Sequence, residues 1–246
     1  MKGMFEMGRK MVTYESLLSM YVRCCSIAGR RGWNERSAGG LSVRLDAEDV
    51  MQMENGLSFR RDFLPLLAPV KDLAKDFILI SGCNAHLEDI ANRPEDLCGV
   101  VQISPDGAGY RIVKGFGTKG GISSDSHELA GMEPNEDLYV HLSIHEMEKK
   151  KKGPYRSVVY HGHPTNLVAL TYLLPLEERS FSDTLRRSSL NLRKNLKRDL
   201  GMVDRLIMDE KELTQITLEK LRQSPSPTAS IRSAHFPHPL IACPPI

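Results

Sequence analysis

Two histidines separated by one glycine, His161 and His163, are the residues of this chain best suited to chemistry. A strand is predicted at 157–161, ending at the first of the two histidines. Side chains at i and i+2 of a strand point to the same face, so two imidazoles there can bind one cation from one side, as Zn²⁺ favours. The alternative is a pair of polar residues that only caps the strand.

A second group of residues precedes these histidines in a segment, 136–149, whose apolar spacing predicts a helix. Glu136 and Asp137 stand about one turn ahead of His141. A carboxylate near a bound metal can act as a general base, taking a proton from a carbon next to a metal-polarised carbonyl. The alternative is an acidic pair that complements the helix dipole. His141 and His145 could form a metal pair of their own, although two residues on one helix face is the favoured interpretation.

A glycine-rich loop, residues 32–41 (GWNERSAGGL), comes before a predicted strand at 39–45. The Ser37 hydroxyl and the backbone N–H groups around Gly39 and Gly40 could surround a phosphate. A tight loop without a ligand is the alternative.

The composition is that of an ordinary globular protein. The 246 residues are 41% hydrophobic and 26% charged, with a formal net charge of +2, which excludes a disordered chain and gives no field that attracts nucleic acid or anionic membranes. The longest apolar run, 167–176, is too short to cross a bilayer. Five cysteines form no CxxC pair, which favours a reducing compartment. We therefore expect a cytoplasmic protein with no membrane or nucleic-acid partner.

The pattern of apolar residues predicts a mixed α/β protein with an antiparallel sheet, because a Pro-Asp-Gly turn at 105–107 joins two of the strands. Strands are expected at 39–45, 77–81, 98–104, 110–115 and 157–161, and helices at 12–30, 88–95, 136–149, 166–174 and 209–223. The lysines at 149–152 are expected to form a solvated loop after their helix.

The chain changes character after about residue 180. Residues 186–198 hold six basic residues with little apolar alternation, so we expect them at the surface; a basic module that contacts nucleic acid is a less favoured alternative. Six prolines follow position 223, and their density predicts no regular element there. The expected organisation is a core at 1–180, a continuation at 181–223 and an irregular proline-rich tail at 224–246.

Three segments together resemble one family in order and spacing: GWNERSAGGLSVRL (32–45), DGAGYRIVKG (106–115) and HGHPTNLVALTYLLPL (161–176). They are similar to the class II, zinc-dependent sugar-phosphate aldolases, most of all to those that act on L-rhamnulose 1-phosphate. The resemblance covers residues 12–180 well and 200–223 weakly. It implies an α/β/α sandwich around a central, mainly antiparallel sheet, with a degraded or irregular C-terminal part, and usually assembly as a homotetramer.

The resemblance also implies a reaction: zinc-dependent retro-aldol cleavage of L-rhamnulose 1-phosphate to dihydroxyacetone phosphate and L-lactaldehyde. By position, His161 and His163 would be two zinc ligands. Asp137 would be the catalytic acid/base, where the family has glutamate. Ser37, Gly39 and Gly40 would lie in the loop that contacts the substrate.

The family's third zinc histidine follows the helix that ends near residue 223. Ungapped counting reaches Arg232, and a shift of three residues reaches His235, with His238 beyond it. A catalytic zinc needs three protein ligands, so His235 is the predicted third. If the C-terminal third is degraded, the alternative function is a non-catalytic aldolase-like protein without bound zinc.

Overall fold

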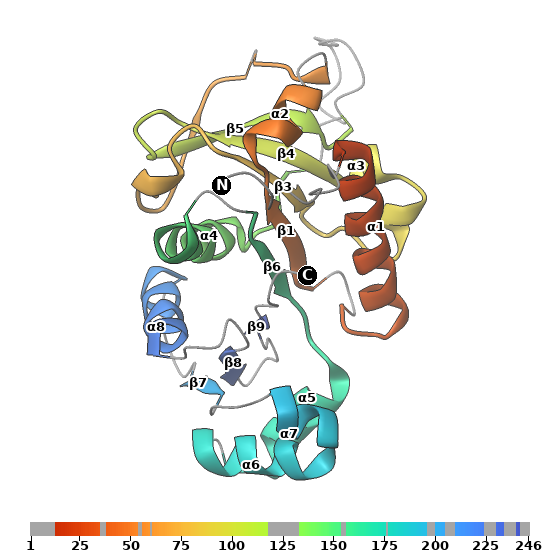
Figure 1. Ribbon diagram of the computed structural model, residues 1–246, viewed down its shortest axis with the longest axis vertical. Coiled ribbons are helices and arrows are strands. Elements are labelled where there is room, and N and C mark those ends of the chain that lie inside the picture. Colours follow the sequence, from red (N-terminus) through yellow and green to blue (C-terminus); the bar gives the residue numbers. More distant parts are fainter. Residues whose placement is uncertain are drawn as a thin grey trace, which may run out of the picture.

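A central antiparallel sheet with helices on both faces forms the body of the molecule (Figure 1). The computed structural model describes residues 13–34, 38–53, 56–59, 61–117, 133–153, 156–175, 177–195, 200–204, 210–223, 230–233 and 240–241. Within them, seven strands follow the order β2-β5-β4-β3-β1-β6-β9. Their bounds are β1 Gly40–Arg44, β2 Leu64–Pro65, β3 Phe77–Ser81, β4 Cys98–Ile103, β5 Gly109–Gly115, β6 Val158–His161 and β9 Leu240–Ile241. The predicted α/β fold class is confirmed.

Of the helices, α1 covers one face of this sheet and α4 the other, whereas α5, α6 and α7 lie together at the lower end of the view (Figure 1). Their bounds are α1 Tyr14–Arg30, α2 Ala47–Met53, α3 Pro94–Leu97, α4 Leu138–Lys152, α5 Thr165–Leu173, α6 Glu178–Ser188, α7 Leu190–Asn195 and α8 Glu210–Gln223, with short 3₁₀ turns η3 Lys71–Leu73 and η4 Asp89–Ala91. In the part of the chain that is described, no helix has the length and apolarity to cross a membrane.

Alternation along the strands divides the core into two layers, because successive side chains of a strand point to opposite faces. Leu41, Val43 and Leu79 pack against α1, whereas Ile78 and Ile80 pack toward the start of α4. β6, which ends at His161, and β1, whose first residue Gly40 pairs with it, therefore lie between α1 and α4.

The helix α4 differs from its expected bounds at both ends. It begins at Leu138, so Asp137 is its cap residue, and it continues through the lysine run to Lys152. The lysines remain helical because acidic side chains pair with them: Lys149 lies 2.8 Å from Asp76 and Lys150 lies 2.8 Å from Asp72. The expected solvated loop is in fact a helix face with paired charges.

The segment expected as a helix at 88–95 is also different. It holds the 3₁₀ turn η4 and then α3, which Pro94 begins rather than blocks. Proline suits the first position of a helix, because the N–H that it lacks would have no partner inside the helix there.

The expectation that no regular element lies among the C-terminal prolines needs a correction. β8 (Ser230–Ser233) pairs in parallel with β7 (Gly201–Asp204), and β9 pairs with β6 in the central sheet. These strands occupy proline-free intervals, so no missing N–H interrupts their ladders. The described part of the basic stretch lies in α6 up to Ser188 and in α7, and Arg187, Arg193 and Lys194 are exposed as expected.

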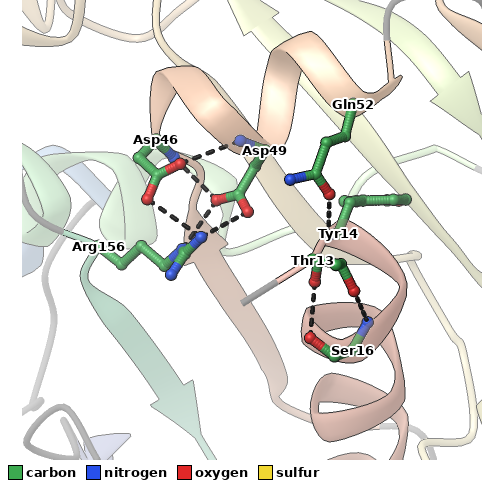
Figure 2. Close-up of polar contacts among 7 residues, drawn as sticks. All are labelled: Thr13, Tyr14, Ser16, Asp46, Asp49, Gln52 and Arg156. Carbon is green, nitrogen blue, oxygen red and sulfur yellow. Dashed lines mark hydrogen bonds and ion pairs between the residues drawn. The ribbon is translucent and has the colours of Figure 1, made fainter. Parts of the chain in front are cut away.

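A group of charged residues attaches the approach to β6 to the helix α2 (Figure 2). Asp46 and Asp49 cap α2 reciprocally, each accepting a hydrogen bond from the other's backbone N–H at 3.0 Å. The Arg156 guanidinium donates to both oxygens of Asp49, at 2.8 and 2.6 Å, and lies 3.1 Å from Asp46. Since Arg156 stands two residues before β6, this bidentate pair ties the start of that strand to α2.

Candidate metal and substrate site

The imidazole rings of His161 and His163 meet at the end of β6. Their Nε2 atoms are 3.2 Å apart and the rings are edge to face, with centroids separated by 5.0 Å. Both residues are buried, with 3% and 8% of their surface exposed. The two ring nitrogens meet as expected, although β6 ends at His161 and His163 lies two residues beyond the strand. Metal binding by the pair stays a prediction.

The glycine-rich loop holds the backbone around these histidines. The His163 N–H donates to the Trp33 carbonyl at 2.5 Å. The buried Asn34 amide donates to the carbonyl oxygens of Ala38 (2.8 Å) and His161 (3.2 Å), and its oxygen accepts from the Tyr160 hydroxyl (2.6 Å). Every polar atom of the Asn34 amide is therefore bonded, which positions the segment that carries the two rings.

Gly39 and Gly40 pack against the walls of this site. Gly39 has a φ of +83°, and a Cβ there would collide with the His161 carbonyl oxygen and the Asn34 amide. A Cβ on Gly40 would lie 2.7 Å from Ser81 Oγ and 2.9 Å from Asn135 Nδ2. Close backbone approach explains both glycines. Their predicted part in substrate binding stays a prediction, and Ser37 lies outside the described residues.

Asp137 approaches the same histidines from the start of α4. Its Oδ2 lies 2.5 Å from His161 Nδ1, on the side of the ring away from His163. Its backbone is held at both ends: its N–H donates to Asn135 Oδ1 at 2.9 Å, and its carbonyl accepts from the His141 N–H at 3.0 Å. Asn135 also donates from Nδ2 to the Gly39 carbonyl at 2.8 Å, so it joins the loop to α4.

Comparison with known proteins shows which family the chain belongs to. The model of the "Class II Aldolase and Adducin N-terminal domain" family matches residues 20–233. The chain belongs to this family. Its description covers adducin as well as aldolases, so membership by itself leaves the activity open.

Individual relatives show which members of the family the chain resembles in sequence and in fold. The chain is 28% identical over 208 residues to a rhamnulose-1-phosphate aldolase of Yersinia pestis (strain Pestoides F), covering 82% of this chain and 69% of that protein. A protein of the same name from Pectobacterium atrosepticum is 28% identical over 193 residues, covering 78% and 66%. The crystal structure of a sugar-phosphate aldolase from Thermotoga maritima superposes with a TM-score of 0.65 over 93% of this chain and 84% of that one, at 18% identity, which supports the fold.

In this class II aldolase family member, two of the three predicted zinc ligands, His161 and His163, lie side by side. The third, His235, is not among the residues that the structure describes. Ligands at tetrahedral Zn–N distances stand about 3.3 Å from each other, close to the separation of the two Nε2 atoms. The described residues hold no group of three side chains that could bind a metal. His235 is outside them, and β9, which begins five positions after His235, pairs Leu240 with His161.

The second histidine pair, His141 and His145, is fully buried beneath β1 and is hydrogen-bonded to serines. Ser42 Oγ lies 2.7 Å from His141 Nδ1 and 2.8 Å from His145 Nε2, and Ser157 Oγ lies 2.6 Å from His145 Nδ1. Burial, with contributions from His141 and Arg44, holds the pKa of His145 well below its usual value of 6.5. This pair connects α4 to β1 and to the approach to β6, in line with the favoured helix-face interpretation.

Three positioning residues were not singled out from the sequence: Asn34, Asn135 and Tyr160. Asn34 lies inside the glycine-rich motif, and Asn135 lies two residues before Asp137. Tyr160 alternates with His161 along β6. A buried side-chain amide that joins two loops produces no periodic pattern in the sequence. Its position inside or next to a motif was the only feature that could have identified it as a positioning residue.

Proposed function

We propose that this protein cleaves L-rhamnulose 1-phosphate to dihydroxyacetone phosphate and L-lactaldehyde with a bound zinc ion. The convergence of the His161 and His163 Nε2 atoms, 3.2 Å apart in a buried strand end, carries the proposal. The substrate is proposed from the rhamnulose-1-phosphate aldolases that are 28% identical to the chain. The alternative, an aldolase-like protein without zinc and without turnover, is the other outcome of the experiment below.

The residues fit a zinc site in part. His161 and His163 would hold the ion, with His235 as the proposed third ligand, and zinc would supply a Lewis acid that polarises the substrate carbonyl. The chain's own residues bring the ligands together: Asn34 holds the His161 backbone and Asp137 bonds its ring. The predicted acid/base role of Asp137 remains a prediction, and so does phosphate binding by Ser37, Gly39 and Gly40.

Assembly is part of the proposal. We propose a homo-oligomer, in line with the tetramer that the resemblance implies. The helix α5 supports it, because this apolar helix buries none of its residues fully and leaves Tyr172 and Leu173 65% and 77% exposed. Sedimentation equilibrium would give the number of chains, and a monomer at working concentrations would contradict this part. The cytoplasmic location stays a prediction.

Metal content tests the function. Purified protein dialysed to remove loosely bound ions is expected to retain about one zinc per chain and to release dihydroxyacetone phosphate from L-rhamnulose 1-phosphate. His161→Ala should lose both. His86→Ala is the matched control, because His86 is exposed and stands outside the group of residues around His161. Zinc near zero and no cleavage in the parent protein would contradict the proposal and favour the non-catalytic alternative.

A further inference from the structure

A cavity of about 200 Å³ lies between the first turns of α1, the helix α3 and the central sheet. Much of its wall is apolar, with Leu18 from α1, Leu79 from β3, Pro94 from α3 and Val100 from β4. In the order of the sheet, β3 and β1 stand between β4 and β6, so three strand spacings, about 14 Å, separate those two strands. The cavity is therefore separate from the candidate metal site at His161.

The size of the cavity suits a ligand with one small ring. An engineered apolar cavity of about 150 Å³ in another protein takes up benzene, so a slightly larger space admits a ring with one small substituent. Cys98 also lines the cavity but adds no charge to its wall. Its thiol donates to the Pro94 carbonyl at 2.9 Å, and burial raises its pKa to about 12.

Two polar groups on the wall can donate hydrogen bonds to a ligand. Lys114 Nζ lies over the Tyr14 ring, 5.5 Å from the ring centroid. Within the part of the chain that is described, the Lys114 ammonium forms no ion pair and the Tyr14 hydroxyl forms no hydrogen bond. Burial, with contributions from Cys98 and Asp49, raises the pKa of Tyr14 to about 12, so the phenol stays a donor. A cation and a second donor beside an apolar space favour a ligand with an anionic acceptor.

Glu95 limits how much negative charge that ligand can carry. It lines the same cavity and is exposed. Across so small a space its carboxylate repels any anion bound at Lys114, and the repulsion grows with the charge of the anion. A carboxylate, with a single charge, suits this wall better than a phosphate dianion.

We propose that this cavity binds a small carboxylate whose apolar part is about the size of one six-membered ring, with Lys114 holding the carboxylate. The apolar wall takes the ring, and the Tyr14 hydroxyl is the second donor. The inference does not depend on the proposed function, because the wall of the cavity contains none of the residues of the candidate metal site.

Methyl ¹H–¹³C spectra of the full chain test the site and its ligand class together. Benzoate and benzamide have the same shape and differ in charge. Benzoate should shift the methyl signals of Leu18, Leu79 and Val100, with a Kd on the order of 1 mM or tighter. Benzamide should bind at least about tenfold more weakly, because it cannot form a charge-assisted hydrogen bond with Lys114. Phenyl phosphate, a dianion at pH 7.5, should also shift these signals more weakly than benzoate.

The same titration can overturn the inference in two ways. If benzoate leaves these methyl signals unchanged, the cavity is not its site. If benzamide or phenyl phosphate binds there as tightly as benzoate, the cavity does not select a carboxylate. Zinc content and aldolase turnover enter neither result, so failure of the proposed function would be seen separately.

A pair of lysine variants tests the role of Lys114. Lys114→Met keeps an unbranched side chain over Tyr14 and removes the ammonium group, so the preference for benzoate over benzamide should fall below about twofold. Lys71→Met is the matched control, because Lys71 is exposed on η3, which packs against α4 on the other face of the sheet. It should keep the preference of the parent protein. Thermal unfolding checks that both variants are folded, and an unchanged preference in folded Lys114→Met would show that Lys114 does not hold the carboxylate.

Discussion

The Tyr160 hydroxyl donates to the Asn34 side-chain oxygen at 2.6 Å, and the same amide donates to the His161 carbonyl. Burial raises the pKa of Tyr160, so the phenol stays protonated and remains a donor. Asn34→Ala would leave these groups without their partner and should lower the free energy of unfolding by about 1–3 kcal/mol, with weaker zinc binding. Chemical denaturation and metal titration would measure both.

A milder substitution at the Tyr160–Asn34 hydrogen bond serves as a control. Tyr160→Phe removes one hydroxyl and leaves both amide donors in place, so its effects should be smaller than those of Asn34→Ala. Equal stability of Asn34→Ala and the parent protein would show that the amide does not hold the His161 segment.

The Asp49–Arg156 pair should be a larger contributor to stability than its neighbour Asp46. Asp49 has no exposed side-chain surface, whereas Asp46 is 30% and Arg156 27% exposed. Asp49→Asn should cost about 2–3 kcal/mol, less than a fully buried pair because water reaches Arg156. Asp46→Asn should cost about 1 kcal/mol or less. Urea denaturation would compare them, and equal losses would contradict the ranking.

Comparison of Gly39 with Gly153 separates the effect of the close contact at the site from the effect of backbone strain. Their φ angles are +83° and +79°, so alanine is strained at both positions. No described atom lies within 4 Å of a Cβ on Gly153, whereas on Gly39 the Cβ would meet the His161 carbonyl and the Asn34 amide. Gly39→Ala should therefore lose more stability than Gly153→Ala, which has the backbone strain alone, and only Gly39→Ala should shift the ¹⁵N signals of His161 and His163. Similar histidine spectra in the two variants would argue against the contact.

His145 should make the protein sensitive to mild acid. Its folded-state pKa is held below 6.5, chiefly by burial, so below that pH the unfolded chain binds a proton that the folded chain resists. Its contribution to stability is therefore fully present above about pH 6.5 and is lost as the pH falls toward the folded-state pKa, by at most about 1.4 kcal/mol per pH unit.

The free energy of unfolding measured against pH checks this prediction. His145→Gln should flatten the acid side of the curve, even if it is less stable throughout. His86→Gln changes an exposed histidine and should keep the slope of the parent protein. A parent-like slope in His145→Gln would show that another group causes the acid sensitivity.

Local patterns predicted the elements that carry the site. The alternation of 157–161 and 39–45 gave β6 and β1, and the i, i+2 spacing placed both imidazoles on one side. The strands depend on residues adjacent in the sequence, whereas His163 lies two residues beyond the end of β6, where its N–H is held by the Trp33 carbonyl. The lysine run was misjudged because its outcome depends on partners distant in the sequence: Asp72 and Asp76 pair with the lysines on the helix.

What the sequence by itself determined is the family, the sheet and the pair of histidines, because motif order and strand periodicity are properties of the chain. The tertiary structure decided how those histidines are held. Asp137 reaches the Nδ1 atom of His161 across 24 residues and Asn34 reaches its carbonyl across 127. Such bonds depend on how the loop, the sheet and α4 pack together, and no local pattern encodes which ring nitrogen a carboxylate will meet.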